Sequence, residues 1–137
     1  MIIDEEYLNS DGSMPEWLQE FVRVSKHIEN ALEYNAGTHN IEDIMYSVAI
    51  GEMQLWTGKD SVIIGQIVVY PQKKVYHMPF VGGNLEDLRE MAPSIIHFAR
   101  YMECSMITTA GRRGWDRVPL LKELGFEPMH YAMKMEI

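Results

Sequence analysis

The stretch from Ser61 to Tyr70 constrains the fold most, because it is apolar on both faces of an extended chain. A strand of this kind is typical of the centre of a sheet, where neither face meets water. Gly65 within it indicates a β-bulge or a close backbone approach. Turns are predicted on either side of it, at Gly58–Asp60 and Pro71–Lys73. They would connect it to two neighbouring strands, at Met53–Thr57 and Val75–Val81.

Two helices are predicted before this sheet. Ser13 with Glu16 three residues later is a helix start, and Pro15 suits the first turn. One helix of about five turns should follow and end at Gly37. Its apolar stripe comprises Trp17, Phe21, Val24, Ile28 and Leu32. A second helix should begin at Asn40 and close at Gly51, with the inner residues Ile41, Ile44, Met45 and Val48.

Strands and helices alternate after the third strand. Pro79 removes a backbone donor, so strand pairing should be interrupted near it. Asn84 is the predicted N-cap of the next helix, and Pro93 should kink or split that helix near Ala92. Its inward residues are predicted to be Leu85, Leu88, Ala92, Ile95, Ile96 and Ala99. This order of elements predicts an α/β fold.

The segment from Ser105 to Phe126 is predicted to form a strand at Met106–Thr109, a turn and a short helix. Asp116 is expected to cap the helix, and Gly125 to end it in a left-handed conformation. The remaining residues alternate strictly, which predicts a final strand. Its inner face would be Met129, Tyr131, Met133, Met135 and Ile137, and its outer face His130, Ala132, Lys134 and Glu136.

The element order and the ending Leu124-Gly125-Phe126 resemble the GNAT (Gcn5-related N-acetyltransferase) fold. This resemblance implies a single domain over residues 1–137 with a mixed, mostly antiparallel sheet and helices on both faces. The QLW near residue 55, the pair Gly82-Gly83 and the sequence GRRGW also resemble small phage proteins with a GNAT-like fold. The internal virion proteins of T7-type podoviruses belong to that group.

The GNAT resemblance implies an acetyl-CoA site at the loop that follows the third strand. The matching residues here are Val81, Gly82, Gly83 and Asn84, where glycines and a helix N-terminus could receive a diphosphate. The family's Gly-x-Gly spacing and leading Arg or Gln are missing, and Glu86 and Asp87 in the next turn would repel a diphosphate. A tight strand-to-helix turn with Asn84 as N-cap is the alternative interpretation.

The catalytic pattern of the family is incomplete. Active members often place a tyrosine where this chain has Leu121, and an asparagine where it has Gly114. His77, on the third strand, is the best-placed candidate for a general base, and an ordinary strand histidine is the alternative. His27, His39 and His130 show no metal-ligand spacing with one another or with Cys104, so no metal site is predicted.

The most distinctive polar feature is Arg112-Arg113 in a turn bracketed by glycines, with Trp115 beside it. Two guanidinium groups could bind a phosphate or a partner's carboxylates, and Trp and Arg are frequent at interface hot spots. We expect an interface at Arg112, Arg113 and Trp115 rather than a catalytic site. The alternatives are a solvated turn that offsets local acidity and a Trp115 that covers the sheet edge.

Composition excludes several classes of function. The net charge of −8 argues against general binding to nucleic acid. No apolar run approaches the ~18 residues of a membrane span. One cysteine, Cys104, cannot form an internal disulfide and suits a reducing compartment. These features suit a cytoplasmic location. The resemblance to phage proteins implies that this is the cytoplasm of a host bacterium, or else a virion.

Two functions remain open from the sequence. The first is a catalytically degenerate GNAT-fold phage protein without a cofactor, which would act in a virion or its assembly through other virion proteins or self-association. The alternative is an active acetyl-CoA-dependent N-acetyltransferase on a small-molecule or protein amine. Fold alone cannot choose between them.

Overall fold

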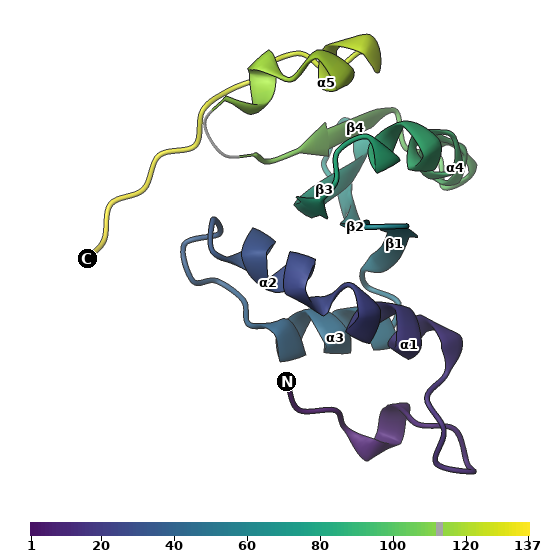
Figure 1. The fold of residues 1–137 in the computed structure, drawn as a ribbon. Coiled ribbons are helices and arrows are strands. Elements are labelled where there is room, and N and C mark those ends of the chain that lie inside the picture. The colour runs from purple at the N-terminus through teal and green to yellow at the C-terminus, as the bar shows by residue number, and fades with distance from the viewer. Residues whose placement is uncertain (112–113) are drawn as a thin grey trace.

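The structure is a computed structural model that describes residues 1–111 and 114–137. Helices at the N-terminal end precede three strands, and two further helices flank a fourth strand (Figure 1). The elements are the 3₁₀ helix η1 (Glu5–Tyr7), α1 (Glu16–Arg23), α2 (Ser25–Leu32), α3 (Ile41–Ala49), β1 (Gln54–Gly58), β2 (Ser61–Val69), β3 (Lys74–Gly83), α4 (Asp87–Tyr101), β4 (Met106–Thr109), the 3₁₀ helix η2 (Trp115–Arg117) and α5 (Pro119–Glu123).

The sheet has the order β1-β2-β3-β4, with antiparallel pairs except for the parallel pair β3–β4. The predicted mixed, mostly antiparallel sheet is therefore confirmed. The pairing of β2 with β3 shifts by one residue, because Ile64 lies opposite Phe80 whereas Gln66 lies opposite His77. Two residues of β3, Met78 and Pro79, thus face one residue of β2, Gly65. The predicted bulge at Gly65 and the interruption at Pro79 are one feature.

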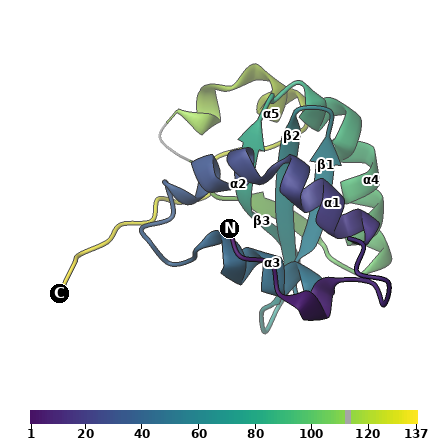
Figure 2. The same ribbon diagram turned by 60° about the horizontal axis from the view of Figure 1, so that its bottom comes forward.

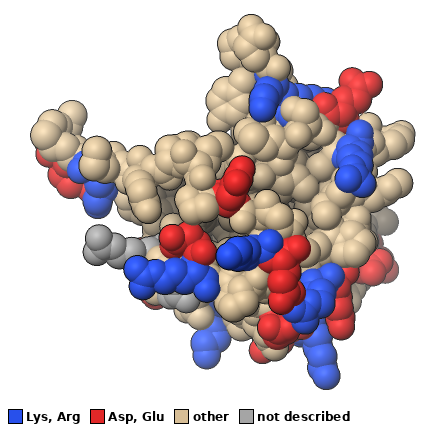
Figure 3. Space-filling view, turned by 90° about the horizontal axis from the view of Figure 1, so that it is seen from above, with Lys and Arg blue, Asp and Glu red and all other residues tan. Residues whose placement is uncertain are grey.

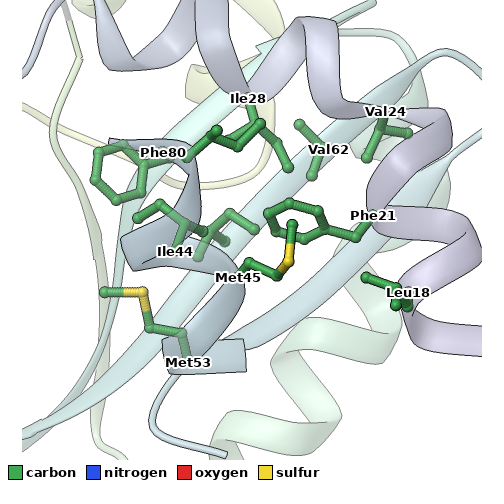
Figure 4. Packing of buried hydrophobic residues seen from close by; sticks show 11 residues of the cluster. Leu18, Phe21, Val24, Ile28, Ile44, Met45, Met53, Val62 and Phe80 are labelled. Atoms are coloured by element: carbon green, nitrogen blue, oxygen red, sulfur yellow. The ribbon is translucent and has the colours of Figure 1, made fainter. Parts of the chain in front are cut away.

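Two core clusters cover the two faces of this sheet. The first core cluster joins α1, α2 and α3 to one face, as Figure 4 shows for Phe21, Ile28, Ile44 and Phe80. The second core cluster joins α4 and α5 to the other face. It contains Ile63, Tyr76, Met78, Leu88, Ile95, Ala99, Leu120 and Leu121. Neighbouring residues of β2 contribute to opposite clusters, as expected for a central strand with helices on both faces.

The single long N-terminal helix predicted from Ser13 is wrong. The chain forms α1 and α2, which are separated at Val24, where the backbone leaves the helical region (φ −100°, ψ 8°). Ser13 does not cap α1, since its hydroxyl bonds to Asp11 and Pro15 occupies the N-cap. The apolar stripe still lies inward, because Phe21, Val24 and Ile28 are buried. At α3 the predicted cap is confirmed, as Asn40 and Asp43 form a reciprocal capping box.

Pro93 does not split α4, which runs without a break from Asp87 to Tyr101. Proline leaves the carbonyl four residues earlier, that of Arg89, without its helical donor. Pro93 and Arg89 both lie on the exposed face, so water can satisfy this carbonyl and the helix continues. Asn84 is not the N-cap residue of α4, which is Glu86, but its side chain accepts a bond from the Glu86 N–H.

The end of the chain differs from its prediction. Asp116 lies in η2 and does not cap α5, which starts at Pro119 with Val118 as N-cap. Gly125 has φ +97°, as predicted, and Phe126 returns its N–H to the Leu121 carbonyl.

The predicted last strand is wrong for the isolated chain. Residues 127–137 form no strand and leave the body of the molecule as an extended tail (Figures 1 and 2). The side chains assigned to the core are instead at least 61% exposed, namely Met129, Tyr131, Met133, Met135 and Ile137. Alternation supplies an apolar face, but a strand forms only where a neighbouring strand pairs with its backbone.

None of the helices in residues 1–111 and 114–137 is both long and apolar enough to cross a membrane.

Candidate functional site

The candidate site begins where β4 ends and its pairing with β3 stops. The two strands pair only from Val75 with Met106 to Met78 with Thr109. Beyond Met78, β3 continues to Gly83 with β2 on one side and no strand on the other, within the described residues. Unpaired backbone groups on this part of β3 can therefore bond to a ligand laid beside the strand.

His77 lies on β3 next to this point, opposite Thr108 of β4. Its Nδ1 is 2.8 Å from the hydroxyl of Thr108 on β4. The ring is half-buried, and burial lowers its pKa below the usual 6.5. At neutral pH the ring is consequently uncharged and able to accept a proton. Its Nε2 makes no hydrogen bond within residues 1–111 and 114–137.

The glycines of the predicted cofactor loop pack against the protein itself. A side chain at Gly82 would lie 2.6 Å from the carbonyl oxygen of His27 in α2. Gly83 has φ +91°, and a side chain there would collide with the backbone of Asp60 and Ser61. Close approach of the β1–β2 turn and of α2 thus explains both glycines without a ligand.

Backbone donors around this loop already have partners. The Asn84 N–H donates to the Asp60 carbonyl at 2.8 Å, and the Glu86 N–H donates to Asn84 Oδ1 at 2.9 Å. The Asp87 N–H donates to the Asn84 carbonyl at 3.2 Å. A diphosphate would have to displace these bonds, so the loop as it stands does not fit one well.

Asp87 closes the same loop from the helix side. Its carboxylate accepts the Asp60 N–H at 2.8 Å and the Ser61 hydroxyl at 2.9 Å. These bonds lower the pKa of Asp87. Glu86 instead pairs with Arg89 at 3.0 Å. The Asp87 charge therefore holds the β1–β2 turn against the start of α4.

A polar groove of about 560 Å³ lies beside this turn, between α1, β1 and α4. Arg23 donates to Glu20 and to the carbonyls of Gly58 and Lys59, so its guanidinium group is already paired within the chain. Figure 3, which shows the molecule from above, has acidic and basic side chains interspersed over one part of the face. The charged residues that line the groove are also of both signs, namely Glu20, Asp87 and Glu90 with Arg23 and Lys59, so the groove is not a single-sign surface that would attract a polyanion.

The predicted interface group is described only in part. Arg112 and Arg113 lie outside the described residues. Trp115 is half-buried and packs against the second core cluster, where a side chain at Gly111 would collide with its ring. Its predicted interface role stays a prediction. Leu121, at the family's tyrosine position, is buried in the same cluster.

Sequence reasoning missed two polar partners. Thr108 holds His77 from the neighbouring strand, and Asp60 closes the loop at Asn84 from 24 residues away in the sequence. Only Pro79 signalled locally that strand pairing changes here. No pattern within one segment could have identified contacts between segments.

The sequence matches no protein-family model and no curated protein. The structure, in contrast, resembles solved acetyltransferase structures. A probable acetyltransferase has a TM-score of 0.64 at 8% identity, over 88% of this chain and 95% of the other. An acetyltransferase of Trypanosoma brucei has a TM-score of 0.58 at 12% identity, over 86% and 95%. A ribosomal-protein-alanine N-acetyltransferase of Brucella melitensis biovar Abortus 2308 has a TM-score of 0.53 at 10% identity, over 87% and 92%.

At these identities the resemblance establishes the fold alone. None of these three structures is described as a phage or virion protein. The chain has an α/β, GNAT-like fold of the kind found in acetyltransferases.

Proposed function

We propose that this protein is an N-acetyltransferase that moves an acetyl group from acetyl-CoA to an amine of a small molecule or a protein. One observation supports this above the others: the pairing of β3 with β4 ends beside the pair His77–Thr108 and leaves the rest of β3 open on that side, in a fold shared with solved acetyltransferases. Three solved structures with this fold are described as acetyltransferases, which favours the enzyme over a virion component.

His77 would act as the general base. The amine nitrogen attacks the thioester carbonyl, the C–N bond forms, the C–S bond breaks, and CoA leaves as a thiolate that takes a proton from water. The amine proton passes to His77 Nε2, which requires Nδ1–H to donate to Thr108. The oxyanion would be held by backbone N–H groups of β3 between Met78 and Val81, Pro79 excepted.

Acetyl-CoA would be bound mainly along β3. The backbone N–H groups of Asn84, Glu86 and Asp87 already donate hydrogen bonds within the chain. The loop would therefore bind a diphosphate weakly at Val81, Gly82, Gly83 and Asn84. We therefore expect weaker acetyl-CoA binding than in an enzyme with a free diphosphate loop.

The test combines calorimetric titration of acetyl-CoA with thiol release over a panel of amines. Measurable release that is lost in His77→Ala and retained in His97→Ala would support the proposal, since His97 is an exposed histidine on α4. A dissociation constant in the low micromolar range, about −8 kcal/mol, would show that the closed loop still admits the donor. No binding at millimolar acetyl-CoA together with no thiol release would overturn the proposal.

A second candidate is a non-catalytic role, favoured by the loop whose donors are filled by the chain itself. In that case the protein would need no cofactor and would act through other virion proteins or through self-association. Arg112, Arg113 and Trp115 are its predicted interface. Co-purification of an Arg112→Ala/Arg113→Ala variant with phage particles, beside the unchanged chain, tests this candidate. Absence of both chains from particles would exclude the virion role.

A further inference from the structure

The C-terminal tail has the alternating sequence pattern of a strand, but it pairs with no strand among the described residues and its apolar side chains are exposed. Five large apolar side chains occupy alternate positions from Met129 to Ile137, and each is at least 61% exposed. The positions between them are mostly polar: His130, Ala132, Lys134 and Glu136. An isolated chain would leave this apolar face in water, which the hydrophobic effect opposes. The tail therefore needs a surface to cover.

Such a surface exists at β4. This strand lies at the edge of the sheet, and β3 is its one partner among the described strands. An unpaired edge presents N–H and C=O groups that can accept another strand. An apolar groove of about 370 Å³ adjoins this edge on the side of α4 and α5, with Ile95, Ile107 and Phe126 in its lining.

The alternation of the tail matches the two faces of β4. Ile107 belongs to the second core cluster, whereas Thr108 bonds to His77 on the opposite face. A strand laid beside β4 would extend the second core cluster with one set of alternate residues. The five apolar tail residues suit that side, and the polar set would lie beside Thr108. A shift of the tail by one residue along β4 would place the apolar residues beside Thr108 and the polar residues against the second core cluster. The pattern therefore favours registers that keep the apolar residues on the side of the cluster.

The tail points away from its own β4. Phe126 is held by its bond to the Leu121 carbonyl and by the second core cluster. Pro128 follows immediately and biases Glu127 toward an extended backbone, which opposes a tight return. Both ribbon views show the tail leaving the body of the molecule (Figures 1 and 2). A second copy of the chain can offer its β4 edge to the tail, which does not reach the β4 edge of its own chain.

We propose that two copies of this chain exchange their C-terminal segments, each placing residues 129–137 along the free edge of β4 in the other. The exchange is reciprocal and gives a closed, two-fold symmetric dimer. Backbone bonds to β4 supply the pairing, and the apolar tail residues fill the groove beside α4. This inference does not depend on catalysis.

Light scattering after size-exclusion chromatography gives the first test on the full chain. We expect twice the mass of one chain for the unchanged protein and for His130→Glu, which adds a charge to the polar face. Met133→Glu adds the same charge to the apolar face and should convert the protein to monomers. Both variants should keep the circular dichroism of the folded body, because residues 129–137 are all exposed. A monomeric unchanged protein at micromolar concentration would overturn the proposal.

Crosslinking separates exchange from return of the tail to its own β4. In a Cys104→Ser background, one tagged chain carries Thr108→Cys and an untagged chain carries Lys134→Cys, which lie on the same predicted face. After the chains are unfolded and refolded together, a short bismaleimide should join tagged to untagged chains. Replacing Thr108→Cys by His97→Cys, on the far side of α4, should abolish this product. A single chain that carries both Thr108→Cys and Lys134→Cys is tested in parallel. If it crosslinks within itself while the mixed chains give no tagged-to-untagged product, the pairing is intramolecular and the exchange is overturned.

Discussion

At the scale of single residues, Gly65 in the bulge of the sheet packs directly against the buried side chain of Tyr76. Tyr76 is fully buried; its hydroxyl donates to Gln54 Oε1 at 3.0 Å and accepts from Trp56 Nε1 at 2.8 Å. Burial raises the pKa of Tyr76 to about 12, so the phenol keeps its proton. A side chain at Gly65 would overlap this ring.

Gly65→Ala should therefore destabilise the protein by about 1–3 kcal/mol, the usual cost of overpacking a core. Chemical denaturation measures the change. Val69→Thr, at an exposed position of the same strand, is the control and should shift stability by less than ~0.5 kcal/mol. Equal effects of the two changes would mean that Tyr76 relaxes freely.

His77 makes stability depend on pH, with a sign set by its lowered pKa. The unfolded chain binds a proton near the usual value of 6.5, whereas the folded chain binds it only at lower pH. Above 6.5 both states are neutral and the residue has no effect. As pH falls below 6.5, protonation favours the unfolded chain, so the folded state loses stability.

Melting curves between pH 7.5 and 5 check this prediction. The unchanged protein should lose more melting temperature over this range than His77→Gln, whose side chain does not titrate. The matched His97→Gln variant should behave like the unchanged protein. A His77→Gln curve parallel to that of the unchanged protein would contradict the burial of the imidazole.

At the scale of elements, α4 tolerates Pro93 at a cost. The proline removes one helical bond to the Arg89 carbonyl, worth up to ~3 kcal/mol together with its steric clash. Part of this is offset, because proline also restricts the unfolded chain by about 0.4–1 kcal/mol. Pro93→Ala should thus raise stability by about 1–2 kcal/mol, measured by thermal melting. Ser94→Ala, at the next exposed position, should gain much less; a loss in Pro93→Ala would show that the ring itself packs.

The end of α5 depends on a backbone conformation that few residues adopt. Gly125 has φ +97° and open space around it, so strain and not collision decides a substitution. Gly125→Val should cost about 1 kcal/mol or more, since a β-branched residue is strained there. Gly125→Asn should cost less, because asparagine is the next most frequent residue at such caps. The same melting temperature for both variants would show that the conformation is not required.

At the scale of the whole molecule, the two core clusters share the strands of one sheet. Val62 and Ile64 belong to the first cluster and Ile63, between them, to the second. Neither cluster can open without exposing the strand that the other covers, so unfolding should be cooperative. Trp17 packs against the first cluster, and Trp56 and Trp115 pack against the second.

Fluorescence can follow each face separately. Trp17→Phe leaves reporters on the second cluster, and Trp56→Phe/Trp115→Phe leaves a reporter on the first. Relative to circular dichroism of the same variant, both signals should show one coincident denaturant transition. A fluorescence midpoint that precedes the dichroism midpoint in either variant would mean that one face unfolds independently.

The sequence by itself determined the elements whose signals are local. The apolar run of β2, the capping box at Asn40 and the left-handed end at Gly125 each depend on neighbouring residues, and the structure confirms all three. Helix continuity was less predictable. The break at Val24 and the unbroken helix at Pro93 depend on packing and solvent exposure. The spacing of apolar residues along a helix does not specify either of these.

Only the tertiary structure decided the candidate site and the tail. His77 could be singled out by its type and strand, but its partner Thr108 comes from another strand. The glycine pair could be predicted as a loop, whereas its closure by Asp60 and Asp87 required the turn and the helix to meet. The tail carries a complete strand pattern and forms no strand, because pairing needs an edge that its own path does not reach.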